Sequence, residues 1–328
     1  MTLRIAVNGC GRIGRNIIRA QMESPRKDID IVMVNDLADV ATTSHLLCFD
    51  TIHGRSKQVI THDGQDLYLA GKKVLYRSQP DPRKLDYVEN EIDLVLECTG
   101  RFVSGPDAQA HIEAGAKRVL ISAPGKQVDR TIVYGVNHET VQGSDKIISN
   151  ASCTTNALAP LVKLLDDTWG LRTGWMTTIH CYTGSQPSID APRGDFLRSR
   201  AAALSMVPTT TSAQRLLNQV LPDIAGRIEA AAVRVPAASV SAVDLAVTLD
   251  RAVTLEEVHA LIRGQSGIIG WTDKPLVSSD LRARSESLIV SLPETRVTEG
   301  GLVRVFGWYD NEWGFSCRML DVAQMMTG

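Results

Sequence analysis

The feature that most constrains the fold is a G-x-G-x-x-G run at residues 9–14, close to the N-terminus. It follows the apolar segment Leu3–Asn8, which predicts a strand, and it opens Arg12–Glu23, whose apolar spacing predicts a helix. An acidic residue, Asp36, ends the next predicted strand, 22 residues beyond Gly14 (36 minus 14). A strand, a glycine turn, a helix and an acidic residue at this spacing are typical of a dinucleotide-binding unit.

Each part of this motif has a physical task. Gly9 permits the tight turn, Gly11 lets the backbone approach a pyrophosphate, and Gly14 lets the helix pack closely on the strand. The helix N-terminus presents free N–H groups and a partial positive charge to the phosphates. Asp36 is expected to accept hydrogen bonds from the ribose hydroxyls and to repel a 2′-phosphate, which favours NAD over NADP. A glycine turn needed only for packing is the alternative, and the agreement of strand, helix and acidic residue argues against it.

The 328-residue chain is long enough for about two domains, and its first half alternates short apolar runs with helical segments. This alternation predicts a parallel sheet covered by helices on both faces. The predicted strands are Leu3–Asn8, Ile29–Asn35, Ile92–Cys98, Val119–Ser122 and Ile132–Val136, and the predicted helices are Arg12–Glu23, Val40–Phe49 and Asp107–Ala114.

After about residue 150 longer segments appear, several of which alternate apolar with small or polar residues. They predict a mixed, largely antiparallel sheet with one face packed. The predicted strands are Trp175–Tyr182, Glu229–Val235, Val240–Leu249, Leu288–Val290 and Leu302–Trp308, and the predicted helices are Thr154–Trp169, Glu256–Arg263 and Glu312–Met326. The polar segment Gly184–Arg200 fits neither period, and a loop of that length is more often functional than not.

Charge and cysteine content exclude several function classes. The 35 Lys and Arg residues nearly balance the 37 Asp and Glu residues, so no basic field recruits nucleic acid or an anionic membrane. Six scattered cysteines without a C-x-x-C pair indicate neither a disulfide framework nor a metal site. Without a leader or a long apolar run, we expect a soluble, cytoplasmic protein with no membrane partner.

One cysteine and one histidine stand out as candidate catalytic residues. Cys153 begins a predicted helix inside the polar run Ser149–Asn156, and the field of a helix N-terminus stabilises thiolate over thiol. His180 lies near the end of a predicted strand, where an imidazole close to Cys153 would take a proton from a substrate hydroxyl. A single histidine in a strand is more often structural, so both interpretations of His180 stay open on these grounds.

Eight motifs, in order along nearly the entire chain, carry a resemblance to a known family. They are NGCGRIGR, VND, ECTG, SNASCTTN, TTIH, RAAA, RVP and GWYDNEWG. Together they make the sequence similar to the phosphorylating glyceraldehyde-3-phosphate dehydrogenases. The resemblance implies a Rossmann-type NAD domain at residues 1–150 and 315–328, an α+β catalytic domain at residues 151–314, and a homotetramer.

The resemblance also implies a reaction in which glyceraldehyde 3-phosphate, NAD and inorganic phosphate give 1,3-bisphosphoglycerate. Cys153 would attack the aldehyde to form a thiohemiacetal, His180 would remove its hydroxyl proton, and phosphate would attack the resulting thioester. The positions matching phosphate-binding residues are Ser152, Thr154, Thr183, Arg198, Thr211, Ser212 and Arg234. The positions matching cofactor-binding residues are Asn8, Gly9, Gly11, Arg12, Ile13, Gly14, Asp36, Thr99, Ser122 and Asn311, of which Asn311 would hold the nicotinamide carboxamide.

Departures from the family pattern concern substrate and cofactor contacts and remove no catalytic group. Ser212 replaces the usual glycine beside an anion site, Pro80 replaces an arginine near the adenine, and Phe315 replaces a tyrosine near the nicotinamide. Ala157 stands where a second cysteine is frequent, which is compatible with Cys153 as the only nucleophile.

Four alternatives remain beside the triose phosphate reaction. The retained Thr183-Gly184 pair and the threonine run 209–211 argue against an erythrose-4-phosphate dehydrogenase. A specialised paralogue that uses arsenate in place of phosphate would employ the same site, with Ser212 as its only indication. A non-catalytic NAD-binding module conflicts with the joint retention of the catalytic and binding residues. A nucleic-acid module would need more basic surface than the short arginine-containing loop offers.

Overall fold

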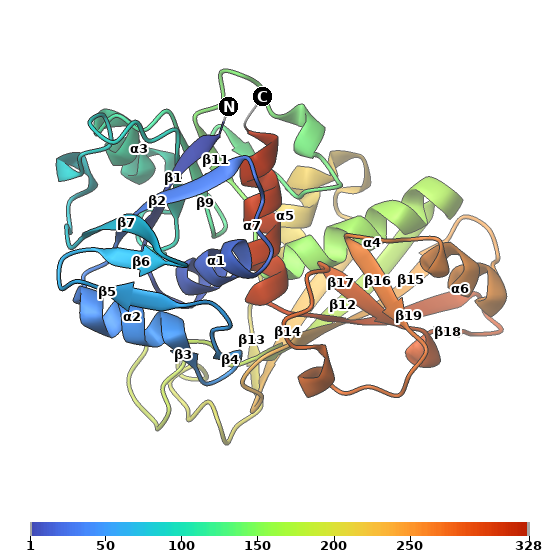
Figure 1. Cartoon of the computed structure of the whole chain (residues 1–328). Coiled ribbons are helices and arrows are strands. Elements are labelled where there is room, and N and C mark those ends of the chain that lie inside the picture. Colours follow the sequence, from blue (N-terminus) through green and yellow to red (C-terminus); the bar gives the residue numbers. More distant parts are fainter. Residues whose placement is uncertain (1, 327–328) are drawn as a thin grey trace. The chain divides into compact units, whose positions relative to one another are not determined.

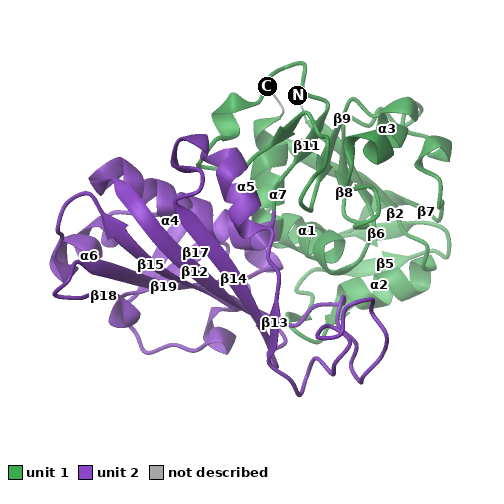
Figure 2. Ribbon diagram, turned by 180° about the vertical axis from the view of Figure 1, so that it is seen from behind, with its two compact units in different colours: residues 1–151, 316–328 green, residues 152–315 purple. Residues whose placement is uncertain are grey.

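The computed structural model describes residues 2–326 (Figure 1). The chain forms two compact units, one made of residues 1–151 and 316–328 and the other of residues 152–315 (Figure 2). The first unit is therefore built from both ends of the chain. No helix in the part of the chain that the structure describes is long and apolar enough to cross a membrane.

The first unit contains a nine-stranded sheet in the order β10-β11-β9-β8-β1-β2-β7-β6-β5. Every pairing from β10 to β7 is parallel, and β7, β6 and β5 form an antiparallel edge. The strands are β1 (Leu3–Asn8), β2 (Ile29–Asn35), β5 (Ile60–His62), β6 (Leu67–Leu69), β7 (Lys72–Arg77), β8 (Leu94–Glu97), β9 (Arg118–Ile121), β10 (Arg130–Thr131) and β11 (Ile147–Ser149), and a separate hairpin pairs β3 (Phe49–Asp50) with β4 (Gly54–Arg55). The helices are α1 (Arg12–Glu23), α2 (Val40–Cys48) and α3 (Gly105–Glu113), with short 3₁₀ helices at Pro82–Lys84 and His138–Thr140.

Strand order places the dinucleotide motif at a switch in the direction of winding. From β1 the chain passes to β2 on one side of the sheet, and later to β8 on the other side of β1. A crevice opens at the carboxyl ends of strands flanking such a point, and this is where nucleotides bind in open parallel sheets. The central strands are buried on both faces, with Ile5, Val7 and Leu96 fully inaccessible, as their unbroken apolar sequence predicts.

One predicted strand of this unit is wrong, and several short strands were not predicted, among them the whole antiparallel edge. Only Arg130–Thr131 pairs as β10; Ile132 N–H still donates to Ser149 O at 2.9 Å, and residues 133–136 turn away from the sheet. The Asn137 side chain accepts from Val133 N–H at 2.8 Å, and Gly135 has a φ of 80°, so a local side-chain bond and a left-handed turn replace the ladder. The antiparallel edge formed by β5, β6 and β7 was missed because its strands are short and rich in polar residues.

The second unit contains an eight-stranded mixed sheet in the order β13-β14-β12-β15-β19-β17-β16, with β18 paired to β19. Five of its seven pairings are antiparallel, so the predicted largely antiparallel sheet is confirmed. The strands are β12 (Leu171–Cys181), β13 (Val207–Thr209), β14 (Ile228–Val235), β15 (Ser241–Leu249), β16 (Ile269–Thr272), β17 (Leu288–Ser291), β18 (Arg296–Val297) and β19 (Leu302–Tyr309). The helices are α4 (Cys153–Trp169), α5 (Ala213–Val220) and α6 (Leu255–Arg263), with 3₁₀ helices at Pro222–Ile224, Ser278–Leu281 and Leu292–Glu294. The helix α7 (Trp313–Met325) begins in this unit and continues into the first.

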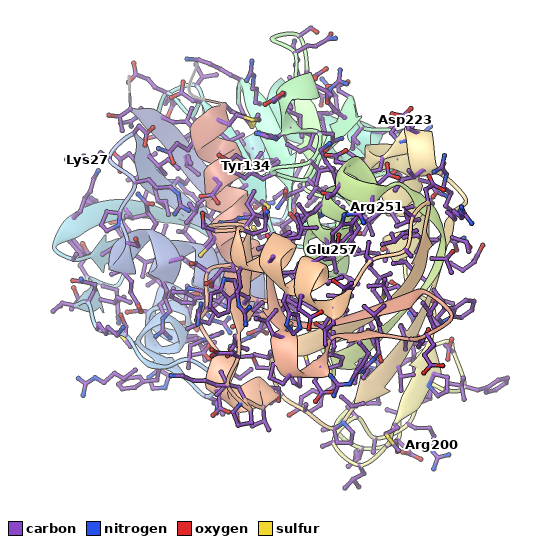
Figure 3. The ribbon with its side chains drawn as sticks, turned by 90° about the vertical axis from the view of Figure 1, so that its right-hand side faces the viewer. Lys27, Tyr134, Arg200, Asp223, Arg251 and Glu257 are labelled. Carbon is purple, nitrogen blue, oxygen red and sulfur yellow. The ribbon has the colours of Figure 1, made fainter. Side chains whose placement is uncertain are left out.

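Local sequence signals explain where these helices begin. Thr254 and Glu257 form a reciprocal capping box at the start of α6, and Arg251 pairs with Glu257 at 2.9 Å (Figure 3). Helix α7 was predicted from the sequence, and its residues from Ser316 onward belong to the first unit. There Asp321 accepts from Arg26 Nε at 3.1 Å.

The segment 184–200 contains neither helix nor strand, as predicted. Arg200, labelled in Figure 3, lies at its end and pairs with Asp190 at 2.8 Å. Large apolar side chains on and just after this segment face solvent, among them Phe196 (96% exposed) and Leu204 (84%).

Candidate active site

Cys153 is the first residue of α4, and the residue before it caps the amino end of that helix. Ser152 is the N-cap, and its hydroxyl accepts a hydrogen bond from Thr155 N–H at 3.1 Å. Ala151 has a φ of 54°, a left-handed conformation that is unfavourable for alanine and often occurs beside functional sites. The capped turn holds the Cys153 thiol at the amino end of the helix.

His180 reaches Cys153 from the end of β12. The side chains of β12 alternate, so Thr178 and His180 are buried on one face whereas Ile179 between them is exposed. Helix α4 packs on this sheet, and its first residue brings Cys153 Sγ to 3.7 Å from His180 Nε2. The two residues proposed from sequence as nucleophile and base are therefore in direct contact.

Arg234 lies beside His180 because β12 and β14 are parallel neighbours with these two residues opposite each other. Its NH1 is 2.7 Å from His180 Nδ1 and donates to the Cys181 carbonyl oxygen at 2.9 Å. His180 Nδ1 is also 2.7 Å from that oxygen. A guanidinium and a carbonyl oxygen thus compete for one ring nitrogen, and the outcome decides which tautomer faces Cys153.

Burial has the largest influence on the pKa of both groups. Burial raises the pKa of the Cys153 thiol, and the nearby Arg234 charge and Thr154 hydrogen bonds, which lower it, do not compensate. The helix N-terminus therefore does not by itself produce a thiolate. Burial, followed by the Arg234 charge, lowers the pKa of His180 from 6.5 to about 4, so the imidazole is neutral near pH 7.

Tyr309, at the end of β19, connects the elements that carry the two catalytic candidates. Its hydroxyl lies 2.8 Å from Thr154 Oγ1 on α4 and 2.8 Å from Thr178 Oγ1 on β12. Its ring also meets that of His180 edge to face, with centroids 6.0 Å apart. Tyr309 is 1% exposed, so these bonds form in a buried setting that fixes the separation of helix and strand.

Asn311 follows β19 and has its amide oxygen fixed from inside the second unit. Cys181 Sγ donates to Asn311 Oδ1 at 3.2 Å, and Ser241 Oγ donates to the same atom at 3.4 Å. Both bonds identify the oxygen as the inward atom of the amide. Asn311 is therefore linked to the end of β12, because Cys181, which bonds to it, is the residue that follows His180.

In the first unit, a cavity of about 260 Å³ lies at the carboxyl ends of β1 and β8. Five of the predicted cofactor-binding residues line it: Asn8, Gly9, Gly11, Asp36 and Thr99. A side chain added at Gly11 would meet nothing within 4 Å, so this position leaves room for a ligand beside the backbone. Leu37, Pro80 and Phe102 form apolar walls of the kind that suit a nucleobase, and the residues present fit a dinucleotide.

The remaining predicted cofactor residues of this unit lie outside that lining. Ile13 and Gly14 are in the first turn of α1, and a Cβ at Gly14 would approach Gly9 O to 2.0 Å, which explains the third glycine. Ser122 N–H donates to Glu97 O at 3.0 Å just after β9. Arg12 pairs with Asp50; burial would raise the pKa of Asp50, but hydrogen bonds, led by that from Arg12, lower it to about 2.

The predicted phosphate-binding residues of the second unit fall into separate groups. Arg198 donates from Nε to Thr209 Oγ1 and from NH2 to Thr210 Oγ1, each at 2.7 Å. Thr211 Oγ1 accepts from Ala213 N–H at 3.1 Å, and Ser212 is the N-cap of α5 without a side-chain cap bond. Thr183 Oγ1 lies 3.0 Å from Ser185 Oγ. Of the predicted phosphate-binding residues, Arg234 contacts His180, and Ser152 and Thr154 flank Cys153. The other four make no hydrogen bond with either catalytic candidate among the described residues.

The sequence matches two family descriptions that together cover most of the chain. Residues 3–105 match the glyceraldehyde 3-phosphate dehydrogenase NAD binding domain, and residues 152–311 match the C-terminal domain of the same enzymes. The chain belongs to the glyceraldehyde 3-phosphate dehydrogenase family. Glyceraldehyde-3-phosphate dehydrogenases of Cereibacter sphaeroides and Xanthobacter flavus are each 47% identical to it, over 99% of both chains. That of Geobacillus stearothermophilus is 44% identical over 98% of both chains.

Two residues beside the candidate sites were not singled out from the sequence. Tyr309 stands inside the GWYDNEWG motif, which was a usable signal, but its link to Thr154 and Thr178 depends on the packing of α4 against β19. Arg101 lines the cavity of the first unit, as Pro80 does, and adds a positive charge to that lining. No local spacing indicates these contacts.

Proposed function

We propose that the protein oxidises glyceraldehyde 3-phosphate with NAD⁺ and inorganic phosphate to give 1,3-bisphosphoglycerate. NAD⁺ binding is assigned to residues 1–150 with 315–328, and the chemistry to residues 151–314. The observation that carries the proposal is the Cys153–His180 pair at 3.7 Å with Arg234 beside it, in a chain that matches both domains of the family.

Catalysis is covalent, and Cys153 acts first as the nucleophile and later as the leaving group. His180 Nε2 takes the thiol proton as the Cys153 sulfur attacks the aldehyde carbon, the carbonyl π pair moves to oxygen, and the same proton then completes the thiohemiacetal hydroxyl. His180 Nε2 then removes that proton while the carbon is oxidised to a thioester. Bound NAD⁺ supplies the two-electron acceptor for this oxidation. Phosphate attacks the thioester carbon, the C–S bond breaks, and the acyl phosphate leaves as the thiol is regenerated.

The base needs its proton on Nδ1, so that Nε2 is free to accept. That tautomer is stabilised when Nδ1–H donates to Cys181 O, 2.7 Å away. In this tautomer Nδ1 and the Arg234 NH1 are both donors at 2.7 Å and repel each other. A phosphate is a stronger acceptor for the guanidinium, so a phosphorylated substrate draws Arg234 from the ring and leaves His180 ready as a base.

Asp36 supports the choice of NAD⁺ over NADP⁺. Its carboxylate accepts from Cys10 N–H at 2.6 Å and from Ala38 N–H at 2.9 Å, which fixes it in the wall of the cavity. Each oxygen keeps a lone pair for a ribose hydroxyl, whereas the charge repels a 2′-phosphate.

We also propose a homotetramer in the cytoplasm. Exposed apolar side chains support the oligomer, because Trp175 and Ile179 lie on the outer face of β12, and Phe196 and Leu204 lie on or after the long loop. All six cysteines are free thiols, as in proteins of reducing compartments. Light scattering on the purified protein tests the oligomer, and a monomeric mass contradicts it.

One assay tests the reaction and its alternatives together. NADH formation is followed with glyceraldehyde 3-phosphate or erythrose 4-phosphate, each with phosphate or arsenate, and with Cys153→Ala as the control. We expect the highest kcat/KM with the triose phosphate and phosphate, and no turnover by the variant. A preference for the tetrose favours the erythrose-4-phosphate reaction, and activity restricted to arsenate favours a specialised role. Absence of NADH in every arm contradicts the proposed enzyme.

A further inference from the structure

A buried polar chain lies beneath the cavity of the first unit and has no part in the chemistry above. Glu97, His111 and Tyr87 are at most 1% exposed. Glu97 Oε2 accepts from Asn8 Nδ2 at 2.6 Å and lies 3.1 Å from His111 Nε2. On the other side of the ring, His111 Nδ1 lies 3.1 Å from the Tyr87 hydroxyl. Burying polar side chains is costly unless they are paired, so a chain of this length invites a functional explanation.

This series of buried polar side chains lies where the winding of the sheet changes direction, between β1 and β8. Asn8 ends β1 and Glu97 ends β8, and the two residues are opposite each other in the parallel pair. Their side-chain bond therefore joins the carboxyl ends of the two strands that border the crevice. Cys98 N–H adds a backbone bond to Asn8 O at 2.7 Å. The width of the crevice depends on these two bonds.

The other oxygen of Glu97 fixes the next residues along the chain. Oε1 accepts from Thr99 N–H at 2.7 Å and also from the Thr99 hydroxyl. Gly9, which has a φ of 93°, packs directly on Thr99, because a Cβ there would meet Thr99 N at 2.7 Å. The carboxylate thus holds Thr99, and Thr99 in turn supports the glycine turn.

The carboxylate also determines which way the polar lining of the cavity points. Because Asn8 gives its NH₂ to Glu97, its oxygen is left to accept from Asn35 Nδ2 at 2.7 Å. Asn35 Oδ1 in turn accepts from Gln79 N–H at 2.9 Å. Asn8, Asn35, Gln79 and Thr99 all line the cavity. Placing a donor at position 97, where the carboxylate now accepts, would reverse or break these bonds.

We propose that Glu97 and His111 are positioning residues for the NAD⁺ site: Glu97 ties β1 to β8 and orients Asn8 and Thr99, and His111 holds the Glu97 carboxylate in place. The inference rests on the proposed function in that it takes NAD⁺ as the ligand of the cavity. Neither side chain belongs to the cavity lining, so each acts through Asn8 and Thr99.

The test compares two replacements of His111 by the dissociation constant for NAD⁺, measured by calorimetry on the full-length protein. His111→Leu removes the donor to Glu97, whereas His111→Gln places an amide nitrogen close to the former Nε2. We expect about tenfold or greater weakening for the leucine variant, the usual scale for a lost hydrogen bond to a charged group, and recovery to within about threefold for glutamine. Glu97→Gln, which sets an amide NH₂ against donors, is expected to weaken binding at least as much.

A matched core variant separates positioning from stability. Val119→Ala removes apolar volume from the buried cluster that also contains Tyr87, and Val119 lies outside the cavity lining. We expect it to lower the urea midpoint while the NAD⁺ dissociation constant stays within about twofold of wild type. If His111→Leu does not fold, Glu97→Gln carries the same comparison.

Unchanged NAD⁺ affinity in His111→Leu or Glu97→Gln overturns the inference, as does equal weakening in the leucine, glutamine and Val119→Ala variants. These results are distinct from a failure of the proposed function. A wild-type protein that binds NAD⁺ but oxidises no phosphorylated aldehyde contradicts that function and leaves the positioning role standing.

Discussion

Removing the Tyr309 hydroxyl tests whether it sets the distance between nucleophile and base. Tyr309→Phe deletes two buried hydrogen bonds, to Thr154 and to Thr178, each 2.8 Å long. At about 0.5–1.5 kcal/mol net per bond, with the threonine hydroxyls left short of a partner, the free energy of unfolding should fall by about 2 kcal/mol. Thr154 follows Cys153, and Thr178 lies two residues before His180, so kcat should also fall, by roughly tenfold or more.

The assay pairs urea unfolding midpoints with steady-state NADH formation, and a double-mutant cycle isolates the contact. Tyr309→Phe and Thr178→Val are measured singly and together, and their effects should fall short of additivity by about 1 kcal/mol. Tyr182→Phe is the matched control, because the Tyr182 hydroxyl makes no hydrogen bond among the described residues, and this variant should stay near wild type. Additive effects of the first pair, or wild-type kcat in Tyr309→Phe, would refute the reasoning.

Three further perturbations follow from the structure. Gly14→Ala should lower the urea midpoint and abolish NAD⁺ binding, because its Cβ would meet Gly9 O at 2.0 Å, whereas Gly11→Ala meets no atom within 4 Å and should keep the wild-type urea midpoint; equal urea midpoints of the two variants contradict the packing argument. Asp36→Ala should raise the kcat/KM for NADP⁺ relative to that for NAD⁺ by removing the repelling charge, and an unchanged ratio excludes Asp36 from this selection. The pKa of His180 falls from 6.5 to about 4 on folding, so its contribution to stability is complete above pH 6.5 and is lost as the pH falls towards 4. At about 1.4 kcal/mol per pH unit the loss amounts to about 3 kcal/mol, and urea midpoints at pH 7 and pH 4.5 should differ less in His180→Gln than in wild type.

The elements with strong periodicity could be predicted from the sequence, and the weakly patterned ones could not. Arg12–Glu23 has the same bounds as the observed α1, because a glycine turn precedes it and its apolar residues recur at helical spacing. The predicted strand at 132–136 failed because the local bond from Asn137 and the left-handed Gly135 outweigh the β propensity of its apolar residues. Propensity describes single segments, whereas a strand also needs a partner.

The sequence predicts which residues form the candidate site, but neither the distances between them nor their protonation. Local context identified Cys153 and His180, but the distance between them depends on α4 packing against β12. The protonation of both groups was beyond sequence reasoning, since burial moves the pKa of the thiol upwards and that of the imidazole downwards. Glu97 stands in the ECTG motif and His111 in an ordinary helical pattern, and neither setting indicates that the two side chains meet.

The candidate sites of the two units share one feature, a pair of parallel neighbouring strands. In each, two parallel neighbouring strands end side by side and place polar residues opposite each other, Asn8 against Glu97 and His180 against Arg234. Parallel strands need long crossover connections, so the partners are 89 and 54 residues apart in sequence. Because the register of a parallel pair is fixed by buried side chains along both strands, the core determines which polar groups meet at the strand ends. The buried apolar residues of these strands therefore fix the positions of the polar groups that the same strands carry.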